Sequence, residues 1–138
     1  MNPGAPAEAP AVFHFCDNQE DADICAALVV EGRKSATAPS LAEIRLAGDP
    51  LPKAGDLAIV TNWAGEAKAL IRTYSAEIRP FSEVDGDFAR AEGEGDGSLG
   101  WWQTAHRQYY TRVLAVSGQT VDDDLAIVCE RFELLLSN

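Results

Sequence analysis

The chain has 138 residues, of which 46% are hydrophobic and 24% are charged, and its formal net charge is −11. This length and composition predict one globular domain, and no apolar run reaches the roughly 20 residues of a membrane-spanning helix. The acidic charge argues against a protein that holds long nucleic acids mainly through phosphate contacts, because such proteins present a basic face.

The beginning of the chain, residues 1–12, is rich in proline and alanine and can bury little apolar surface. We therefore predict a flexible N-terminal tail over residues 1–12, followed by one domain over residues 13–138. The three cysteines have no paired spacing, so they argue against a disulfide framework. Free thiols favour a reducing compartment, and we expect a cytoplasmic protein. Cys25 and Cys129 lie among apolar residues and are expected to be core thiols.

Two helices are predicted in the first part of the domain. A helix over residues 17–31 is capped by Asp17 or Asn18, and it ends at Gly32. A shorter helix follows within residues 39–46. The residues expected on the buried face of the first helix are Ile24, Ala27 and Leu28.

From Asp56 onward the hydrophobic pattern changes to that of strands. Residues 57–61 predict a strand, and a hairpin loop leads into a second strand over residues 67–74. Residues 76–80 are expected to form a further strand or a bulged continuation of the second. The last strand, residues 126–134, begins apolar on both faces, which predicts a position inside the sheet.

Two more helices are expected between these strands. A short one lies within residues 81–91, and the longest begins at its N-cap Ser98 and is closed by Gly118. The domain is therefore α+β, with a mostly antiparallel sheet or small barrel flanked by helices. The predicted buried stripe of the longest helix is Leu99, Trp102, His106, Tyr109 and Val113.

The segment from Gly32 to Thr37 places an amine and two hydroxyls just after the first helix. A lysine at this position is commonly an exposed cation that the helix dipole favours. Lys34 with a lowered pKa in a partly desolvated pocket would instead act as a base or a nucleophile. Ser35 and Thr37 are either caps and turn formers or hydroxyls that serve chemistry and ligand binding.

The segment of residues 92–97 carries three carboxylates separated by glycines. It is either a solvated linker before the longest helix or a loop that turns one carboxylate toward a ligand. Two carboxylates can also hold a hard cation such as Mg²⁺, but no further oxygen cluster is evident. We predict no cofactor and leave a divalent metal open. His106 is expected to be a hydrogen-bonded core residue rather than a catalyst.

These features, in this order and spacing, resemble the ASCH domain family, a relative of the PUA-like fold, over about residues 13–135. The chain is similar to small single-domain bacterial members. The resemblance implies a small β-barrel flanked by helices, with a cleft where the lysine loop and the glutamate loop converge. The residues that carry it are the segment 32–37, Gly55-Asp56, Phe88-Ala89, the segment 92–99, Trp102 with His106, and the segment 128–133.

Family members are thought to bind RNA or nucleotides. Some small bacterial members remove the acetyl group from acetylcytidine, and at least one kind is reported as a metal-dependent ribonuclease. The resemblance implies Lys34 as base or charge stabiliser, Thr37 as nucleophile and Glu92 as proton shuttle. The chain departs from the amidohydrolase members by an insertion around residues 39–51 and by the glycine-rich segment 93–97.

We therefore predict an RNA- or nucleoside-binding protein with a hydrolytic site, an amidohydrolase or a ribonuclease. The alternative is a non-catalytic regulatory module that binds RNA or a nucleotide. The expected partners are a nucleoside, a nucleotide or a short single-stranded RNA, and a homodimer stays open. A surface patch around Trp63 or Trp101 would indicate an interaction protein instead. The residues expected to bind the ligand are Arg33, Ser35, Glu94, Trp102 and Tyr109.

Overall fold

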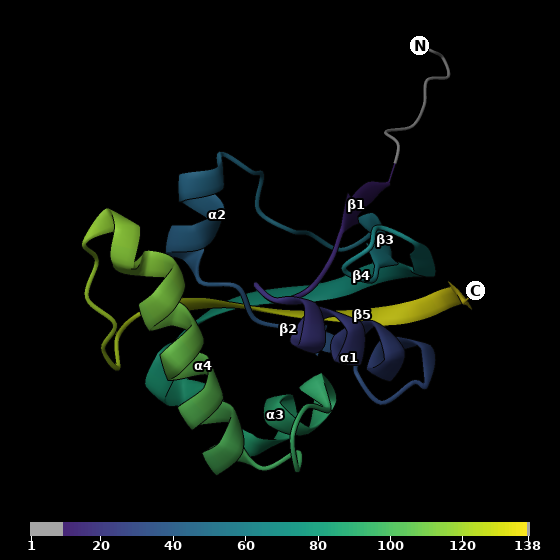
Figure 1. The fold of residues 1–138 in the computed structure, drawn as a ribbon. Helices are drawn as coiled ribbons and strands as arrows, with labels where there is room; N and C mark the ends of the chain where they lie inside the picture. The colour runs from purple at the N-terminus through teal and green to yellow at the C-terminus, as the bar shows by residue number, and fades with distance from the viewer. Residues whose placement is uncertain (1–9, 138) are drawn as a thin grey trace.

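The computed structural model describes residues 10–137, whose strands form one five-stranded mixed sheet. The strands are β1 (Ala11–Phe13), β2 (Ala36–Thr37), β3 (Leu57–Thr61), β4 (Ala67–Pro80) and β5 (Ala126–Ser137). Their order across the sheet is β1-β3-β4-β5-β2. The pair β1 and β3 is parallel, and all other neighbours are antiparallel (Figure 1).

The sheet does not close, so the predicted β-barrel is wrong. Its two edges are β1 and β2, which have three and two residues. Edge strands this short supply too few backbone groups to pair with one another across a closed barrel. Neither edge strand was predicted, because two or three residues show no alternation. The tail predicted over residues 1–12 lies mostly outside the described residues, and its last two residues belong to β1.

The long strands β4 and β5 pair along nearly their whole length, from Ala69 opposite Ser137 to Pro80 opposite Ala126. The register shifts twice, once between Leu70 and Ile71 and once after Thr73. Such bulges bend a strand and increase its twist. The segment of residues 76–80 is therefore the bulged continuation of the preceding strand, one of the two predicted forms.

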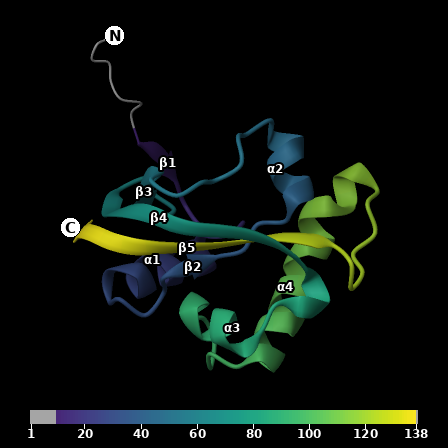
Figure 2. The same ribbon diagram turned by 180° about the vertical axis from the view of Figure 1, so that it is seen from behind.

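Within the described residues, four α-helices surround this sheet: α1 (Gln19–Val30), α2 (Leu41–Ala47), α3 (Gly86–Glu92) and α4 (Leu99–Leu114). Figures 1 and 2 show α1 and α3 on one side of the long strands, α2 on the other, and α4 across one end. The predicted caps are confirmed for α1 and α4, where Asn18 and Ser98 accept backbone hydrogen bonds from the first turn. None of these helices is long and apolar enough to cross a membrane.

The buried face of α1 differs from the one predicted. On α1, Ile24 is 51% exposed, and smaller side chains face the sheet instead. Apolar residues occur on every side of this helix, so the pattern alone does not select a face. On α4, Trp102 is buried as predicted, and Leu99 and Val113 are partly buried against the core. On this helix, Tyr110 is fully buried and Tyr109 only half-buried. The buried residues of α1 are Ala22, Cys25, Ala26 and Val29, and those of α4 are Trp102, Tyr110 and Leu114.

Two hydrophobic clusters form the core, and both are built on the sheet. One lies beneath α3 and α4, where the ring of Phe81 stacks on Trp102 with centroids 5.7 Å apart. The other lies beneath α1, where Phe15 stacks on Phe132 at 6.4 Å. The connection between α1 and β2 runs from the second cluster to the first, since Ala36 belongs to the cluster beneath α3.

Helix α3 ends at Gly93, whose backbone passes very close to the connection between α1 and β2. Gly93 has a φ of 69°, and a Cβ placed there would lie 2.2 Å from the carbonyl oxygen of Arg33. Only glycine combines this left-handed conformation with so close an approach of two backbones. The contact brings the end of α3 against the segment that carries Lys34.

We expect Gly93→Ala to destabilise the protein more than Gly48→Ala, which is its matched control. Gly48 has a φ of 72° at the end of α2, with nothing within 4 Å of an added Cβ. Its substitution therefore costs only the strain of placing a Cβ in the left-handed conformation, about 1–2 kcal/mol. Gly93→Ala adds a steric overlap worth about 1–3 kcal/mol more. Urea unfolding of both variants measures the difference, and equal losses would contradict the close approach.

Candidate active site

The side chain of Lys34 is buried, with 1% of its surface exposed. Its Nζ donates to Oε1 of Glu92 at 2.7 Å, to Oε2 of Glu94 at 2.6 Å and to the carbonyl of Ala36 at 2.9 Å. An ammonium group has three protons, so all of its donors are used. The ring of Phe15 also lies 5.0 Å from Nζ. Lys34 is therefore a buried, fully bonded cation rather than a solvated helix-end lysine.

Backbone hydrogen bonds aim this side chain at the end of α3. The amides of Arg33 and Lys34 both donate to the carbonyl of Leu28, which turns the chain sharply after α1. The next amide, that of Ser35, donates to the carbonyl of Ala91 in α3. The connection is thus tied to both helices before it enters the sheet as β2.

Glu92, the last residue of α3, links Lys34 to α4. While Oε1 binds Lys34, Oε2 accepts a hydrogen bond from Nε1 of Trp102 at 2.6 Å and lies 3.0 Å from Nε2 of His106. Residues 102 and 106 are one helical turn apart, so one face of α4 supplies both groups. Nδ1 of His106 lies 2.9 Å from the Trp102 carbonyl. Both ring nitrogens therefore face acceptors, which favours the doubly protonated imidazolium.

The charges of this network stabilise one another. Burial alone would lower the pKa of Lys34, but Glu92 and Glu94 outweigh it and hold that pKa above its usual value. Burial would raise the pKa of Glu92, but Lys34 and His106 hold it well below its ordinary 4.5. Burial would lower the pKa of His106, but Glu92 raises it above 6.5. A lysine with a lowered pKa, acting as a base, is therefore not what the structure contains.

This network borders a cleft with a volume of about 1120 Å³. Thr37 in β2 lines the same cleft and is half-buried. Within residues 10–137, the hydroxyl of Thr37 forms no hydrogen bond, whether with Lys34, Glu92 or any other group. The structure thus brings Lys34 and Glu92 into direct contact and places Thr37 in the same cleft, with its hydroxyl unbonded among the described residues.

Another carboxyl group in the cleft, that of Glu130, was not predicted as a site residue. Glu130 lies directly opposite Thr37 in the ladder between β2 and β5, so both side chains point to one face, about 5 Å apart at Cβ. It accepts a hydrogen bond from the Thr73 hydroxyl. Burial raises the pKa of Glu130, which the Thr73 hydrogen bond partly offsets. The strand pairing that places Glu130 here could not be derived from the sequence pattern.

Two of the five predicted ligand-binding residues, Glu94 and Tyr109, line the cleft. The Tyr109 hydroxyl donates to Glu43 at 2.8 Å. Trp102 instead lies in the core, where its indole nitrogen holds Glu92. The neighbouring Trp101, 38% exposed, is the tryptophan that borders the cleft.

The remaining two predicted ligand-binding residues do not line the cleft. The side chain of Arg33 is exposed after the end of α1. The Ser35 hydroxyl lies 3.3 Å from the carbonyl of Ala91 and donates to it, so its contact is with α3. Both residues belong to the connection between α1 and β2, which contacts the end of α3. Their role is therefore structural.

The acidic segment before α4 divides into two parts. Glu92 and Glu94 converge on Lys34. Asp96 instead accepts a hydrogen bond from the Ser98 amide at 2.9 Å, and hydrogen bonding to the side chain and then the amide of Ser98 holds its pKa below the usual value. Within residues 10–137, no group of three or more His, Cys, Asp or Glu side chains is arranged to hold a metal ion. The Lys34 ammonium occupies the position between the two carboxylates that a divalent cation would need.

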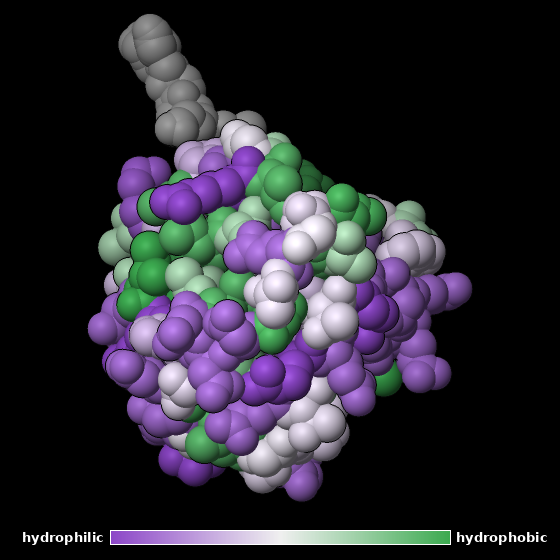
Figure 3. Space-filling view, turned by 90° about the vertical axis from the view of Figure 1, so that its left-hand side faces the viewer, coloured by the Kyte–Doolittle hydropathy of each residue, from purple (hydrophilic) through white to green (hydrophobic). Residues whose placement is uncertain are grey.

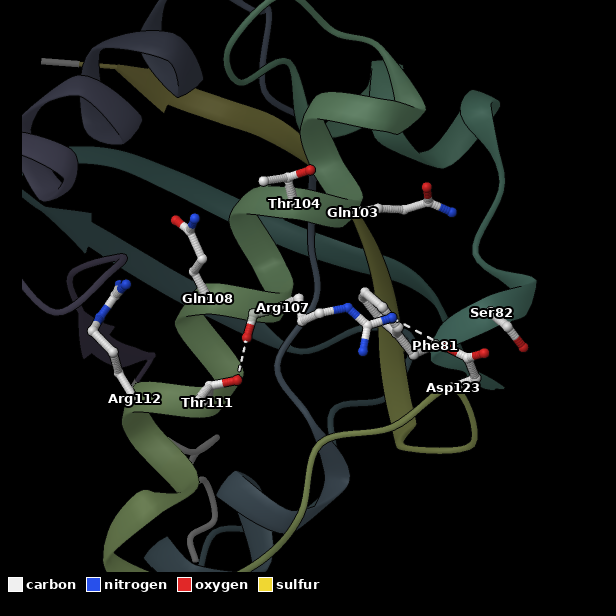
Figure 4. Close-up of a pocket in the computed structure, with 9 residues that line it drawn as sticks. All are labelled: Phe81, Ser82, Gln103, Thr104, Arg107, Gln108, Thr111, Arg112 and Asp123. Atoms are coloured by element: carbon white, nitrogen blue, oxygen red, sulfur yellow. Dashed lines mark hydrogen bonds and ion pairs between the residues drawn. The ribbon is translucent and has the colours of Figure 1, made fainter.

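A second hollow, of about 840 Å³, lies on the outer side of α4 (Figure 4). Arg107 extends over the ring of Phe81 at 4.7 Å and pairs with Asp123 at 3.0 Å. Arg112, at its other end, pairs with Asp17. Each charged side chain described in this hollow therefore has a partner, and the cleft beside Lys34 is the stronger candidate.

We expect Glu92→Gln to lower the free energy of unfolding by about 3–5 kcal/mol, because it removes the carboxylate that Lys34 and His106 share and leaves Glu94 alone to compensate two buried cations. The matched control is Glu133→Gln, which removes an exposed ion pair with Arg72 of 2.9 Å. That change should lose at most about 1 kcal/mol. Chemical denaturation at neutral pH compares the two. Similar losses would contradict a central role for the buried pair.

The effect of His106→Gln should depend on pH. The pKa of His106 is raised in the folded protein, so the stability it contributes is complete below its ordinary value of 6.5 and is lost as pH rises through the raised pKa. We expect His106→Gln to lower the free energy of unfolding by about 2 kcal/mol at mildly acidic pH, and by less as the pH becomes alkaline. Denaturation across pH, with His14→Gln as control, measures it. A loss that grows with pH would contradict the imidazolium.

Comparison with known proteins agrees with this fold. A model of the ASCH domain matches residues 11–136. The crystal structure of an ASCH domain from Lactobacillus crispatus JV V101 has a TM-score of 0.84 and 34% identity, over 90% of this chain and 79% of that one. A protein from Enterococcus faecalis V583 has a TM-score of 0.86 and 34% identity, over 94% and 78%. A search of curated proteins finds no match. By its sequence and by its fold, this chain belongs to the ASCH domain family.

Proposed function

We propose that this protein is a hydrolase that removes an acyl group from a modified nucleoside, with acetylcytidine as the model substrate. The observation that carries the proposal is the buried contact of 2.7 Å between Lys34 and Glu92, in one cleft with the unbonded hydroxyl of Thr37. The family resemblance assigns the working residues of the amidohydrolase members to these three positions. The proposal rests on that juxtaposition.

The cleft suits an uncharged ligand. Seven carboxylic side chains line it, whereas its lysine and its arginine, Lys34 and Arg112, are both paired with acids. An electrostatic field of this sign repels phosphates and does not oppose a neutral nucleoside. The ribonuclease alternative is therefore less well supported than the amidohydrolase. The acidic residues are Asp17, Asp21, Asp49, Asp56, Glu92, Glu94 and Glu130.

Aromatic side chains border the same cleft and can receive a base. Trp101 and Tyr109 come from α4, and Phe13 comes from β1. Flat aromatic faces stack on nucleobases, which is the usual way in which proteins hold single bases. Figure 3 shows hydrophobic residues gathered over the upper part of one face, beside hydrophilic ones. The volume of the cleft is ample for a nucleoside.

The chemistry follows from the charge states. The Thr37 hydroxyl attacks the acyl carbon, the bond from that carbon to the base nitrogen breaks, and the nitrogen leaves with the proton that the hydroxyl lost. Lys34 keeps its own proton, so it stabilises negative charge instead of acting as the base. Both oxygens of Glu92, the expected proton shuttle, are engaged by Lys34, Trp102 and His106. In its place, the carboxyl groups of Glu94 and Glu130 border the cleft and can carry the proton. Water then hydrolyses the threonine ester, which releases the acid.

One observation favours a second candidate function, a non-catalytic module that binds a nucleoside. A nucleophile ordinarily lies within hydrogen-bond reach of its base. Among the described residues, Thr37 has no such partner, and every proton of Lys34 is already bonded. In this alternative the buried ion pair supports the wall of a binding cleft.

We expect wild-type protein to release cytidine from acetylcytidine, and Thr37→Val to lower kcat/KM at least about 100-fold, since it keeps the shape but loses the nucleophile. Thr37→Ser should retain measurable turnover. Thr111→Val, on the exposed side of α4, is the matched control and should keep full activity. Chromatographic detection of cytidine measures the turnover of acetylcytidine by all four proteins.

Calorimetry with acetylcytidine, and a parallel assay with short single-stranded RNA, separate the alternatives. Binding without turnover by the wild type would favour the non-catalytic module. Cleavage of the RNA would favour the ribonuclease. Equal turnover by wild type and Thr37→Val would overturn the role of the hydroxyl. If the wild type neither binds nor turns over acetylcytidine, the nucleoside proposal as a whole is overturned.

A further inference from the structure

A pair of thiols lies in the wall of the cleft and takes no part in the Lys34 network. The Sγ atoms of Cys16 and Cys25 are 3.5 Å apart, and both residues are free cysteines. Cys16 lies in the loop between β1 and α1 and is partly exposed, whereas Cys25 is buried on α1. Both line the cleft. Cys25 and Cys129 are buried as expected, but the contact of Cys25 with Cys16 was not predicted.

We propose that Cys16 and Cys25 are a redox-modification site, which forms a reversible intramolecular disulfide when the protein meets a peroxide. A disulfide has an S–S distance of about 2.05 Å. From the observed 3.5 Å, the two sulfur atoms need to approach by about 1.5 Å. The mobile partner is Cys16, because a loop shifts more easily than the buried residue of a helix.

The backbone of Cys16 supports this pairing. Its φ of 68° makes it the one residue other than glycine, within the described part of the chain, in the left-handed conformation. A cysteine occupies this region at an energetic cost, so the surrounding structure must hold it there. Here the loop is anchored by the buried ring of Phe15, which directly precedes it. The strained residue presents its sulfur to Cys25.

The two thiols differ in access, and this difference assigns their roles. Cys16 is accessible from the cleft, so its thiol reacts with the peroxide to give a sulfenic acid and one water molecule. The hydrogen bond with Cys16 and burial raise the pKa of Cys25, which protects it from direct oxidation. The sulfur of Cys25 then displaces the sulfenic oxygen as a second water. Two thiols and one peroxide thus give one disulfide and two waters.

The third cysteine does not compete for this reaction. Cys129 is 5% exposed and belongs to the hydrophobic cluster beneath α4, whereas Cys25 belongs to the cluster beneath α1. Burial raises the pKa of Cys129 to about 12. Oxidation should therefore give one defined product, and Cys129 serves as an internal control.

The disulfide would also act on the candidate active site. Phe15 directly precedes Cys16, and its ring covers Nζ of Lys34 at 5.0 Å. Drawing Cys16 toward α1 displaces the residue that shields the buried ammonium. Oxidation of the thiol pair would thereby change how well the Phe15 ring shields Lys34 from solvent, independently of the function of the cleft.

We test the proposal by treating the folded full chain with hydrogen peroxide, removing the peroxide, and counting free thiols after denaturation. Wild-type protein should fall from three thiols to one, and dithiothreitol should restore all three. Peptide mapping should find a link between Cys16 and Cys25. The matched control, Cys129→Ala, should fall from two thiols to none.

Cys16→Ser removes a partly exposed thiol and is the variant least expected to disturb folding. It should keep both remaining thiols, because Cys25 and Cys129 are buried apart. Cys25→Ala should form no internal link, with Cys16 oxidised further to its acids. The proposal is overturned if peroxide leaves three thiols in the wild type, if reductant fails to restore them, or if the link joins two molecules or includes Cys129.

Discussion

The buried contact between Lys34 and Glu92 is the constraint on which the rest of this structure depends. Two opposite charges out of water are stable only when every donor and acceptor is satisfied. Lys34 meets this condition through Glu92, Glu94 and a backbone carbonyl, and Glu92 meets it through Trp102 and His106 of α4. The pair therefore fixes the start of β2, the end of α3 and the first half of α4 relative to one another.

The same constraint shapes the chemistry available to the cleft. Because the carboxylates hold the proton on Lys34, the lysine supplies charge rather than basicity. A carboxyl group in the same cleft, that of Glu130, faces Thr37 from the neighbouring strand. An excess of acids around the cleft selects against phosphates, in line with the net charge of −11 of the whole chain. The electrostatics of the cleft and of the whole chain thus both oppose anionic ligands.

The sequence predicted the elements better than their faces. Capping residues such as Asn18 and Ser98 mark the first turn of a helix in the local sequence, so the starts of α1 and α4 were predicted correctly. The two edge strands were not predicted, because β1 and β2 exist only through pairing with distant strands. The contact of Lys34 with Glu92 followed from the family resemblance, whereas Glu130 and the thiol pair depend on tertiary packing. The spacing of residues along the chain does not indicate that Glu130 faces Thr37 or that Cys16 contacts Cys25.

The sequence separation within the site has a consequence for how the protein folds. Lys34 and Glu92 are 58 positions apart, and Thr37 pairs with a strand near the C-terminus. Contacts of such long range form only after large loops have closed, which makes them late events in folding. A nascent chain that lacks β5 has no partner for β2, so it has a lysine and a threonine without a cleft. The candidate site is therefore complete only when β5 has paired with β2.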